Sequence, residues 1–403
     1  MNAHDLVKDQ RTLDARCRAW RELGVFAFDT EFIRDNTYDA ALCLVQVGAG
    51  GEVVLIDPTD DLDLGVFWEL VCDENITTII HAGKEDFELC LRATGRPPRN
   101  VFDVQIAAGF VGYSYPLSLS RLVDQVLHRR VAKGQTLTDW ARRPLTAEQI
   151  RYAIDDVTHL CAVYEKLSAR LKRRRRLSWV AEEFRRFEDA HFYAPPAPER
   201  VAKLKGTKRL DGLGLVVIGV LIEWRHRWAR ERNRPIRALM RDDVLVEIAR
   251  RRPKRAADLA VLRGFPQSRN SKVVKELLTV IEQACQTPKS EWPEPHRPRE
   301  ESPMTKATLD ILSAVTRALC YEHGVSHDLL GGARRLRELL DYHRNNNTER
   351  PALLTGWREK FAGRRLIALL EGRSEVHLSG WPRDTRLEIV THAEAPQDGE
   401  AES

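Results

Sequence analysis

No stretch of the sequence is apolar over a length that would cross a membrane. The longest apolar run, residues 213–222, is followed at once by Glu223 and then by Arg225, whereas a membrane-spanning helix needs about 20 apolar residues. Residues 1–20 mix acidic and basic side chains and lack the apolar centre of a secretory signal. We therefore expect a protein without membrane spans that is located in the cytoplasm.

Paired cysteines and a phosphate-binding loop are absent as well. The seven cysteines, at positions 17, 43, 72, 90, 161, 285 and 320, form no CxxC pair and lie mostly among apolar neighbours. This pattern favours reduced, buried thiols over disulfides or zinc ligands. No GxxxxGK[ST] motif occurs, which argues against an ATP-driven helicase.

Two proline-rich stretches, residues 194–200 and 287–303, divide the chain of 403 residues into three parts. With 43% hydrophobic and 31% charged residues, the chain is long enough for two or three soluble domains, each with its own core. The expected domains are 1–193, 207–287 and 304–390, followed by a disordered acidic tail at 391–403.

Charge is distributed unevenly along the chain. Residues 201–289 hold 21 Lys and Arg against 9 Asp and Glu, a net charge of +12, whereas the whole chain carries +5 and the remainder therefore −7. A basic middle beside an acidic remainder indicates a polyanion-binding module joined to a part that handles cations.

The first part has the pattern of an α/β domain with a mixed sheet. Three β-rich runs lie close together between residues 25 and 57, and a β-branched strand at 76–83 and helices at 117–127 and 146–172 follow. The other two parts have helical periodicity and almost no strand signal, so we expect two all-α domains after the sheet.

A pair of carboxylates ends the strand VFAFDTEF at residues 25–32. Successive side chains of a strand point to opposite faces, so Asp29 and Glu31 share one face. Like charges at this spacing repel one another, and burial strengthens the repulsion. A bound cation would remove it.

Two further segments can add acids to this pair. Asp86, next to Glu85, follows the buried strand at the start of a helix, and Tyr152 and Asp156 lie four residues apart on one helix face. Oxygen ligands suit hard cations such as Mg²⁺ or Mn²⁺. Four carboxylates can hold two such ions about 3.5–4 Å apart, the arrangement for phosphodiester hydrolysis.

Each of these residues also has a plain structural interpretation. Asp29 or Asp86 alone could cap a turn or a helix, and a helical Tyr is usually packing. The spacing favours Asp156 over its neighbour Asp155 as the ligand. Tyr152, with an ordinary pKa of about 10, is expected to orient the attacking water rather than to deprotonate it.

The motifs DTEF, HAGKEDFE and YAIDDV, in this order, resemble those of the DEDD exonuclease superfamily in its Tyr subclass. FDVQIAA at 102–108 and LTDWARRPLTAEQIRYAIDDVTHL at 137–160 narrow the resemblance to the ribonuclease D family. It implies an RNase H-like fold and 3'-to-5' removal of nucleotides with two divalent ions, Mg²⁺ or Mn²⁺. It assigns metal binding to Asp29, Glu31, Asp86 and Asp156, and a catalytic role to Tyr152.

The middle part resembles an HRDC domain, and the last part resembles a more degenerate second one. Arginines crowd the first helix of the middle part and the loop after it, and a net charge of +12 favours a surface that follows phosphates. The residues expected to contact nucleic acid are Arg225, Arg227, Arg232 and Arg234, together with Gln46 and Trp140 of the first part.

The expected function is that of a metal-dependent 3'-5' exoribonuclease that releases 5'-monophosphates. The resemblance implies RNA with an accessible 3' end as the substrate, above all tRNA precursors. We expect a monomer without an obligate protein partner. A DNA exonuclease of repair and a non-catalytic nucleic-acid-binding scaffold remain the alternatives.

Overall fold

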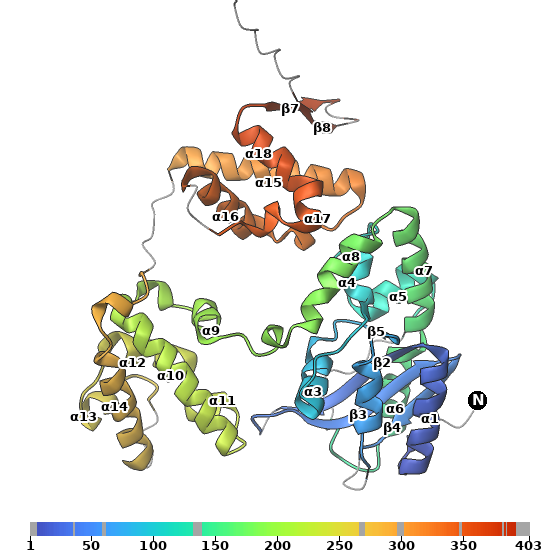
Figure 1. Ribbon diagram of the computed structural model, residues 1–403, viewed down its shortest axis with the longest axis horizontal. Helices are drawn as coiled ribbons and strands as arrows, with labels where there is room; N and C mark the ends of the chain where they lie inside the picture. Colours follow the sequence, from blue (N-terminus) through green and yellow to red (C-terminus); the bar gives the residue numbers. More distant parts are fainter. Residues whose placement is uncertain are drawn as a thin grey trace, which may run out of the picture.

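The computed structural model describes residues 6–391 apart from 35–36, 59–61, 132–138, 266–270, 296–301, 346–348, 381–382 and 384. The chain forms three parts that can be followed in Figure 1: an α/β part at the lower right, a helical middle part at the lower left and a second, mainly helical part at the top. No helix among the described residues is both long and apolar enough to cross a membrane. The tail expected at 391–403 lies outside the described residues from position 392 on.

A six-stranded mixed sheet forms the centre of the first part. Its strands are β1 (Leu6–Val7), β2 (Val25–Ile33), β3 (Ala41–Ala49), β4 (Glu52–Ile56), β5 (Thr77–Ile80) and β6 (Val101–Asp103). They lie in the order β1-β4-β3-β2-β5-β6, in which β2, β3 and β4 are antiparallel neighbours and β2, β5 and β6 are parallel ones. The predicted meander of residues 25–57 is confirmed as β2, β3 and β4.

Helices pack around this sheet. They are α1 (Gln10–Leu23), α2 (Gly65–Val71), α3 (Lys84–Thr94), α4 (Val104–Gly109), α5 (Leu119–Leu127), α6 (Ala147–Thr158), α7 (Leu160–Arg173) and α8 (Leu177–Phe184). Phe26 and Phe28 of β2 point to one face of the sheet, where both rings contact Phe67 of α2. Alternation along β2 therefore turns Asp29 and Glu31 to the opposite face.

The structure differs from the expected helices in two places. The single helix predicted for 146–172 is two helices, α6 and α7, which meet at His159. Thr158 donates from its hydroxyl to the carbonyl of Ile154, 2.6 Å away, and such bonding to the preceding turn bends helices. Helix α1 had no counterpart in the sequence analysis, although Asp9 caps its start by accepting from the backbone N–H of Thr12.

Close packing brings α6 onto the sheet. A Cβ atom on Gly48 of β3 would lie 2.9 Å from the backbone carbonyl oxygen of Val157, so the helix rests almost directly on the strand. Only glycine permits this approach without a shift of one of the two backbones. The packing matters because Val157 follows Asp156 on α6.

The middle part is a helical bundle with its own apolar core. Its helices are α9 (Ala197–Lys203), α10 (Gly212–Glu231), α11 (Ile236–Leu239), α12 (Asp242–Arg251), α13 (Ala256–Ala260) and α14 (Ser271–Cys285). Leu221, Trp224 and Ile248 are buried in the core. Val201 and Leu204, at and just after α9, also pack against it, so this bundle begins before the expected boundary at 207.

One tyrosine of the first part contacts the middle part. Tyr38, in the connection between β2 and β3, donates from its backbone N–H to the side-chain oxygen of Asn233 at 3.1 Å, and its hydroxyl lies 3.1 Å from Nδ1 of His226. The guanidinium of Arg230 lies 5.4 Å from the centre of the Tyr38 ring. In Figure 1 the region of α10 and α11 accordingly approaches the β2–β3 end of the sheet.

The last part packs directly on the first. Its elements are α15 (Pro303–His323), α16 (Gly332–Asn345), α17 (Gly356–Arg358), α18 (Arg364–Leu370), β7 (Ser374–Ser379) and β8 (Arg386–Thr391). Its apolar residues form one continuous cluster with those of the α/β part. The domain expected at 304–390 was predicted to be all-helical, but a β-hairpin of β7 and β8 follows α18.

A buried ion pair crosses this contact. Arg358 of α17 donates from Nη1 to Oε1 of Glu183 on α8, at 2.6 Å, and also hydrogen-bonds the carbonyl of Leu329. The indole N–H of Trp357 donates to the same Glu183 oxygen. Trp357 also stacks on Trp179, with their ring centres 5.6 Å apart.

Candidate active site

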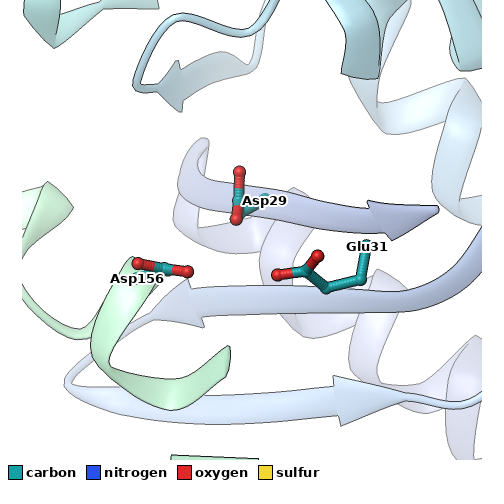
Figure 2. Close-up of side chains that lie close together, drawn as sticks. All are labelled: Asp29, Glu31 and Asp156. Carbon is teal, nitrogen blue, oxygen red and sulfur yellow. The ribbon is translucent and has the colours of Figure 1, made fainter. Parts of the chain in front are cut away.

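Three carboxylates converge on one point of the sheet. Asp29 and Glu31 come from β2, and Asp156 comes from α6, which covers this face. Each offers one oxygen, and the three oxygens lie within 4.8 Å of one another. Figure 2 shows the side chains pointing toward a common space between strand and helix. The structure thus brings together residues that are more than 120 positions apart in the sequence.

Asp86 lies beside this group but is not one of the three converging residues. It is buried in the first turn of α3, and its carboxylate accepts a hydrogen bond from the hydroxyl of Thr30. Its negative charge helps to raise the pKa of both Asp29 and Glu31. Thr30 was not predicted as a site residue, and its position between two acids was the only signal in the sequence.

Burial and mutual repulsion alter the acidity of the cluster. Burial, with the charges of Asp86, Asp156 and Glu31, raises the pKa of Asp29 well above its ordinary value. Burial, with Asp156 and Asp86, raises the pKa of Glu31 to about 8, and burial raises the pKa of Asp156 to about 6. Full ionisation of the three carboxylates in the metal-free protein therefore has an electrostatic cost.

Tyr152 is half-buried one helical turn before Asp156. Burial, the charges of the neighbouring carboxylates and a side-chain interaction with Asp156 raise the pKa of its phenol. The phenol is therefore protonated at neutral pH and can act only as a hydrogen-bond donor or acceptor. Its protonation is compatible with the orienting role expected from the sequence.

Two local features hold α6 in place. Thr146 and Gln149 form a capping box at its start, in which each side chain bonds the backbone of the other. Just before it, Arg143 donates to both carboxylate oxygens of Asp57 and to the carbonyl of Cys43 in β3. Arg143 was missed as a supporting residue, although it lies in the quoted stretch LTDWARRP.

Two expected RNA contacts are buried instead. Trp140 is 7% exposed and packs near Tyr152, with ring centres 6.1 Å apart. Gln46 is 0% exposed in the centre of the sheet. Neither side chain is exposed to a ligand at the surface: α6 packs on β3, which carries Gln46, and Trp140 belongs to an apolar cluster that Tyr152 packs against. Trp140 instead packs beside the ring of Tyr152.

The arginines of the middle part divide into two kinds. Arg225 does not decorate the surface as expected: its side chain is 5% exposed, and it pairs with Asp242 at 2.7 Å and bonds the carbonyl of Met240. Its role is to hold α10 to α12. The remaining three expected contacts are exposed, namely Arg227, Arg232 and Arg234.

His81, directly after β5, and Asp103, at the end of β6, take part in the local fold. Nε2 of His81 lies 2.8 Å from the carbonyl of Leu117. Asp103 caps α4 by accepting from the backbone N–H groups of Gln105 and Ile106. Both interactions fix loops next to β5 and β6.

The donor set suits a hard divalent cation. The three converging residues supply only carboxylate oxygens, the ligands of Mg²⁺, Mn²⁺ and Ca²⁺, and no histidine or thiol that would select zinc. Within the described residues no Lys or Arg forms an ion pair with any of the three. A cation would supply the missing positive charge.

Comparisons with known proteins agree with this geometry. The 3'-5' exonuclease family matches residues 5–172, the HRDC family matches 215–281, and the C-terminal HRDC family of ribonuclease D matches 303–366. Ribonuclease D of Pseudomonas paraeruginosa is 36% identical over 91% of this chain and 97% of its own length. Ribonuclease D of a Shewanella species is 31% identical over 92% and 95%.

A solved structure extends the likeness to three dimensions. The crystal structure of Escherichia coli RNase D, described as an exoribonuclease involved in structured RNA processing, superposes with a TM-score of 0.80 at 28% identity. The match covers 92% of this chain and 99% of that one. Together with the sequence relatives and the three matched domains, it shows that the chain belongs to the ribonuclease D family of hydrolytic 3'-5' exoribonucleases.

Proposed function

We propose that Asp29, Glu31, Asp86 and Asp156 bind two divalent cations and that the protein removes nucleotides hydrolytically from RNA 3' ends as 5'-monophosphates. The observation that carries this proposal is the convergence of three carboxylates within 4.8 Å in a member of this family. When bound, divalent cations supply positive charge for the developing charge on the phosphate and activate water as the nucleophile.

The chain's own residues then have distinct tasks. Asp29, Glu31 and Asp156 hold the cations on the sheet, and Asp86 completes the acidic set from α3. The phenol of Tyr152 stays protonated and orients the attacking water by a hydrogen bond. Orientation of a nucleophile lowers the entropic part of the barrier.

The proposed substrates are structured RNA precursors, above all tRNA precursors with a free 3' end. Support comes from the basic middle part, with a net charge of +12 over residues 201–289, and from exposed Arg227, Arg232 and Arg234. Such contacts bind phosphates and position RNA without reading its sequence. We further propose that the protein works in the cytoplasm as a monomer, with Mg²⁺ or Mn²⁺.

A labelled substrate tests this function. A 5'-labelled RNA stem with a short single-stranded 3' tail is incubated with Mg²⁺ or Mn²⁺, with EDTA, and alongside a DNA of the same sequence. The expected result is a ladder shortening from the 3' end, absent in EDTA and weaker on DNA. Equal trimming of DNA would support the repair alternative, and bound but intact RNA would support the scaffold.

Proton release should accompany cation binding. In the metal-free protein Glu31 and Asp156, with pKa values of about 8 and about 6, retain protons that the unfolded chain loses near pH 4 to 5. Metal-free stability should therefore fall as pH rises from about 5 to about 8. Because cations bind the ionised carboxylates, Mn²⁺ should raise the melting temperature more at pH 8 than at pH 6.

Melting curves in EDTA and in Mn²⁺ across this pH range check the expectation. Since the groups interact, the observed transitions belong to the cluster rather than to one residue. If Mn²⁺ raised the melting temperature equally at pH 6 and pH 8, the predicted release of protons on cation binding would be wrong.

Substitution of Gly48 should disturb the site through the backbone. In Gly48→Ala the new methyl group would meet the carbonyl oxygen of Val157 at 2.9 Å, so α6 must move away from the sheet and carry Asp156 with it. We expect a destabilisation of about 1–3 kcal/mol and slower trimming. Gly219→Ala in α10, where nothing lies within 4 Å, is the matched control and should leave trimming unchanged.

A further inference from the structure

The sheet contains an amide side chain without a hydrogen-bond partner among the described residues. Gln46 lies in the middle of β3, opposite Asp29 of β2 and Leu55 of β4. It is 0% exposed, and both its Nε2 and its Oε1 atoms lack a partner in the described part of the chain. Its neighbours in β3, Val45 and Val47, are equally buried but apolar. Gln46 is therefore a polar exception in a central strand.

A buried amide without hydrogen-bond partners destabilises the folded protein. Leaving a buried polar group unpaired costs about 1–3 kcal/mol, and most buried polar atoms in folded proteins are paired. An apolar side chain of similar size would avoid this cost. The position of Gln46 therefore calls for a partner that it acquires in the working protein.

The geometry identifies where this partner lies. Directly opposite residues of an antiparallel pair place their side chains on the same face, with Cβ atoms about 4.5–5.5 Å apart. Gln46 therefore shares a face with Asp29, and Glu31 lies two residues further along β2. Gly48, two residues from Gln46, lies on this face and is covered by α6. The side chain of Gln46 therefore points to the side of the sheet where α6 and the three carboxylates lie.

We propose that Gln46 is a positioning residue for the cation site, an inference that rests on the proposed function. When Asp29 binds a cation with one carboxylate oxygen, the Nε2–H group of Gln46 donates to that carboxylate and fixes its orientation. Carboxylates that bind metals are themselves commonly hydrogen-bonded, and loss of such a partner weakens metal affinity by about 10- to 100-fold. Complete burial excludes direct contact with RNA.

The test measures metal binding separately from trimming. Titration calorimetry of the full-length protein gives the Mn²⁺ affinity of the wild type, of Gln46→Met, which nearly preserves volume, and of Gln46→Leu. Both variants should bind Mn²⁺ about 10- to 100-fold more weakly, melt in EDTA at or above the wild-type temperature, and bind RNA normally in EDTA. High Mn²⁺ should restore part of the trimming rate.

A second unpartnered buried group in the same sheet provides the control. Thr78 of β5 is 0% exposed and its hydroxyl also lacks a partner among the described residues, but it lies opposite Phe26 rather than a carboxylate. Thr78→Val should leave Mn²⁺ affinity unchanged. If Thr78→Val weakened Mn²⁺ binding as much as Gln46→Met does, the loss of affinity would come from altered packing of the sheet. That result would overturn the inference.

Other outcomes separate this inference from the proposed function. Mn²⁺ affinity within about twofold of the wild type in both Gln46 variants, against the 10- to 100-fold expected, would overturn the positioning role while leaving the cation site intact. Weaker RNA binding in EDTA would instead show that the Gln46 substitutions disturb the protein beyond the cation site, and it would overturn the positioning role. If the wild type itself bound no Mn²⁺, the proposed function would fail and the inference with it.

Discussion

Asp156→Asn is expected to slow the removal of 3' nucleotides by at least about 100-fold. Loss of a mere hydrogen-bonding partner of a metal ligand already costs about 10- to 100-fold, and Asp156 is proposed as a ligand itself. Its carboxylate is one of three whose oxygens lie within 4.8 Å of one another, and Tyr152 lies one helical turn before it on α6. The substitution therefore removes a proposed cation ligand and changes the surroundings of Tyr152, whose phenol is proposed to orient the attacking water.

Stability should change in the opposite direction from activity. Replacing a buried carboxylate by a neutral amide removes repulsion with Asp29 and Glu31, whose pKa values Asp156 raises. The melting temperature of Asp156→Asn in EDTA should thus equal or exceed that of the wild type, and Mn²⁺ should raise it less. This combination separates a lost functional group from a misfolded protein.

Asp155→Asn is the matched control, because it makes the same change one residue earlier on α6. Asp155 is not among the converging carboxylates, so its substitution should retain trimming close to the wild-type rate. Ladders from 5'-labelled RNA under single-turnover conditions measure both variants. Equal losses in the two variants would show that general charge on α6, rather than ligation by Asp156, supports activity.

Arg358→Met is expected to cost about 3–5 kcal/mol of stability, because it leaves the carboxylate of Glu183 buried and without its ion-pair partner. The side chains of Arg358 and Glu183 are only 10% and 9% exposed. This loss of folding free energy should weaken the contact between the last part and the first part. Urea unfolding followed by tryptophan fluorescence reports on this contact, since Trp357 and Trp179 stack across it.

The double variant Glu183→Gln with Arg358→Met should recover most of this loss. It removes both charges together, and the new amide keeps an oxygen that can accept the indole N–H of Trp357, as the carboxylate of Glu183 does. Arg364→Met is the control, because Arg364 is 71% exposed in its pair with Glu359 and exposed pairs contribute about 0–1 kcal/mol. A small effect of Arg358→Met, similar to that of Arg364→Met, would contradict the interpretation.

The acidic residues of the candidate site could be predicted from the sequence, because local strand and helix patterns place them on common faces. Strand alternation puts Asp29 and Glu31 on one face, and the helical repeat puts Tyr152 and Asp156 on another. The motif order then indicated a common site. The sequence could not show that Asp86 bonds Thr30, or that Arg143 clamps Asp57, because these contacts join residues 56 and 86 positions apart.

The predictions that the structure contradicts are those of side-chain exposure. Arg225 belongs to an arginine-rich helix face by composition, yet it turns inward to Asp242. Gln46 and Trp140 are polar or aromatic residues near the motifs, yet both are buried. Burial depends on which elements pack over a residue, and that packing joins segments whose contact no local pattern reveals.

The sequence by itself predicted three parts, a basic middle part and the acidic residues that we propose as cation ligands, since charge, proline content and periodicity are local properties of the chain. Only the tertiary structure decided that the last part shares an apolar cluster with the sheet, and that Gln46 lies without a described partner opposite Asp29. Those features arise where distant segments exclude water from one another, and burial then sets the energy of every polar group enclosed between them.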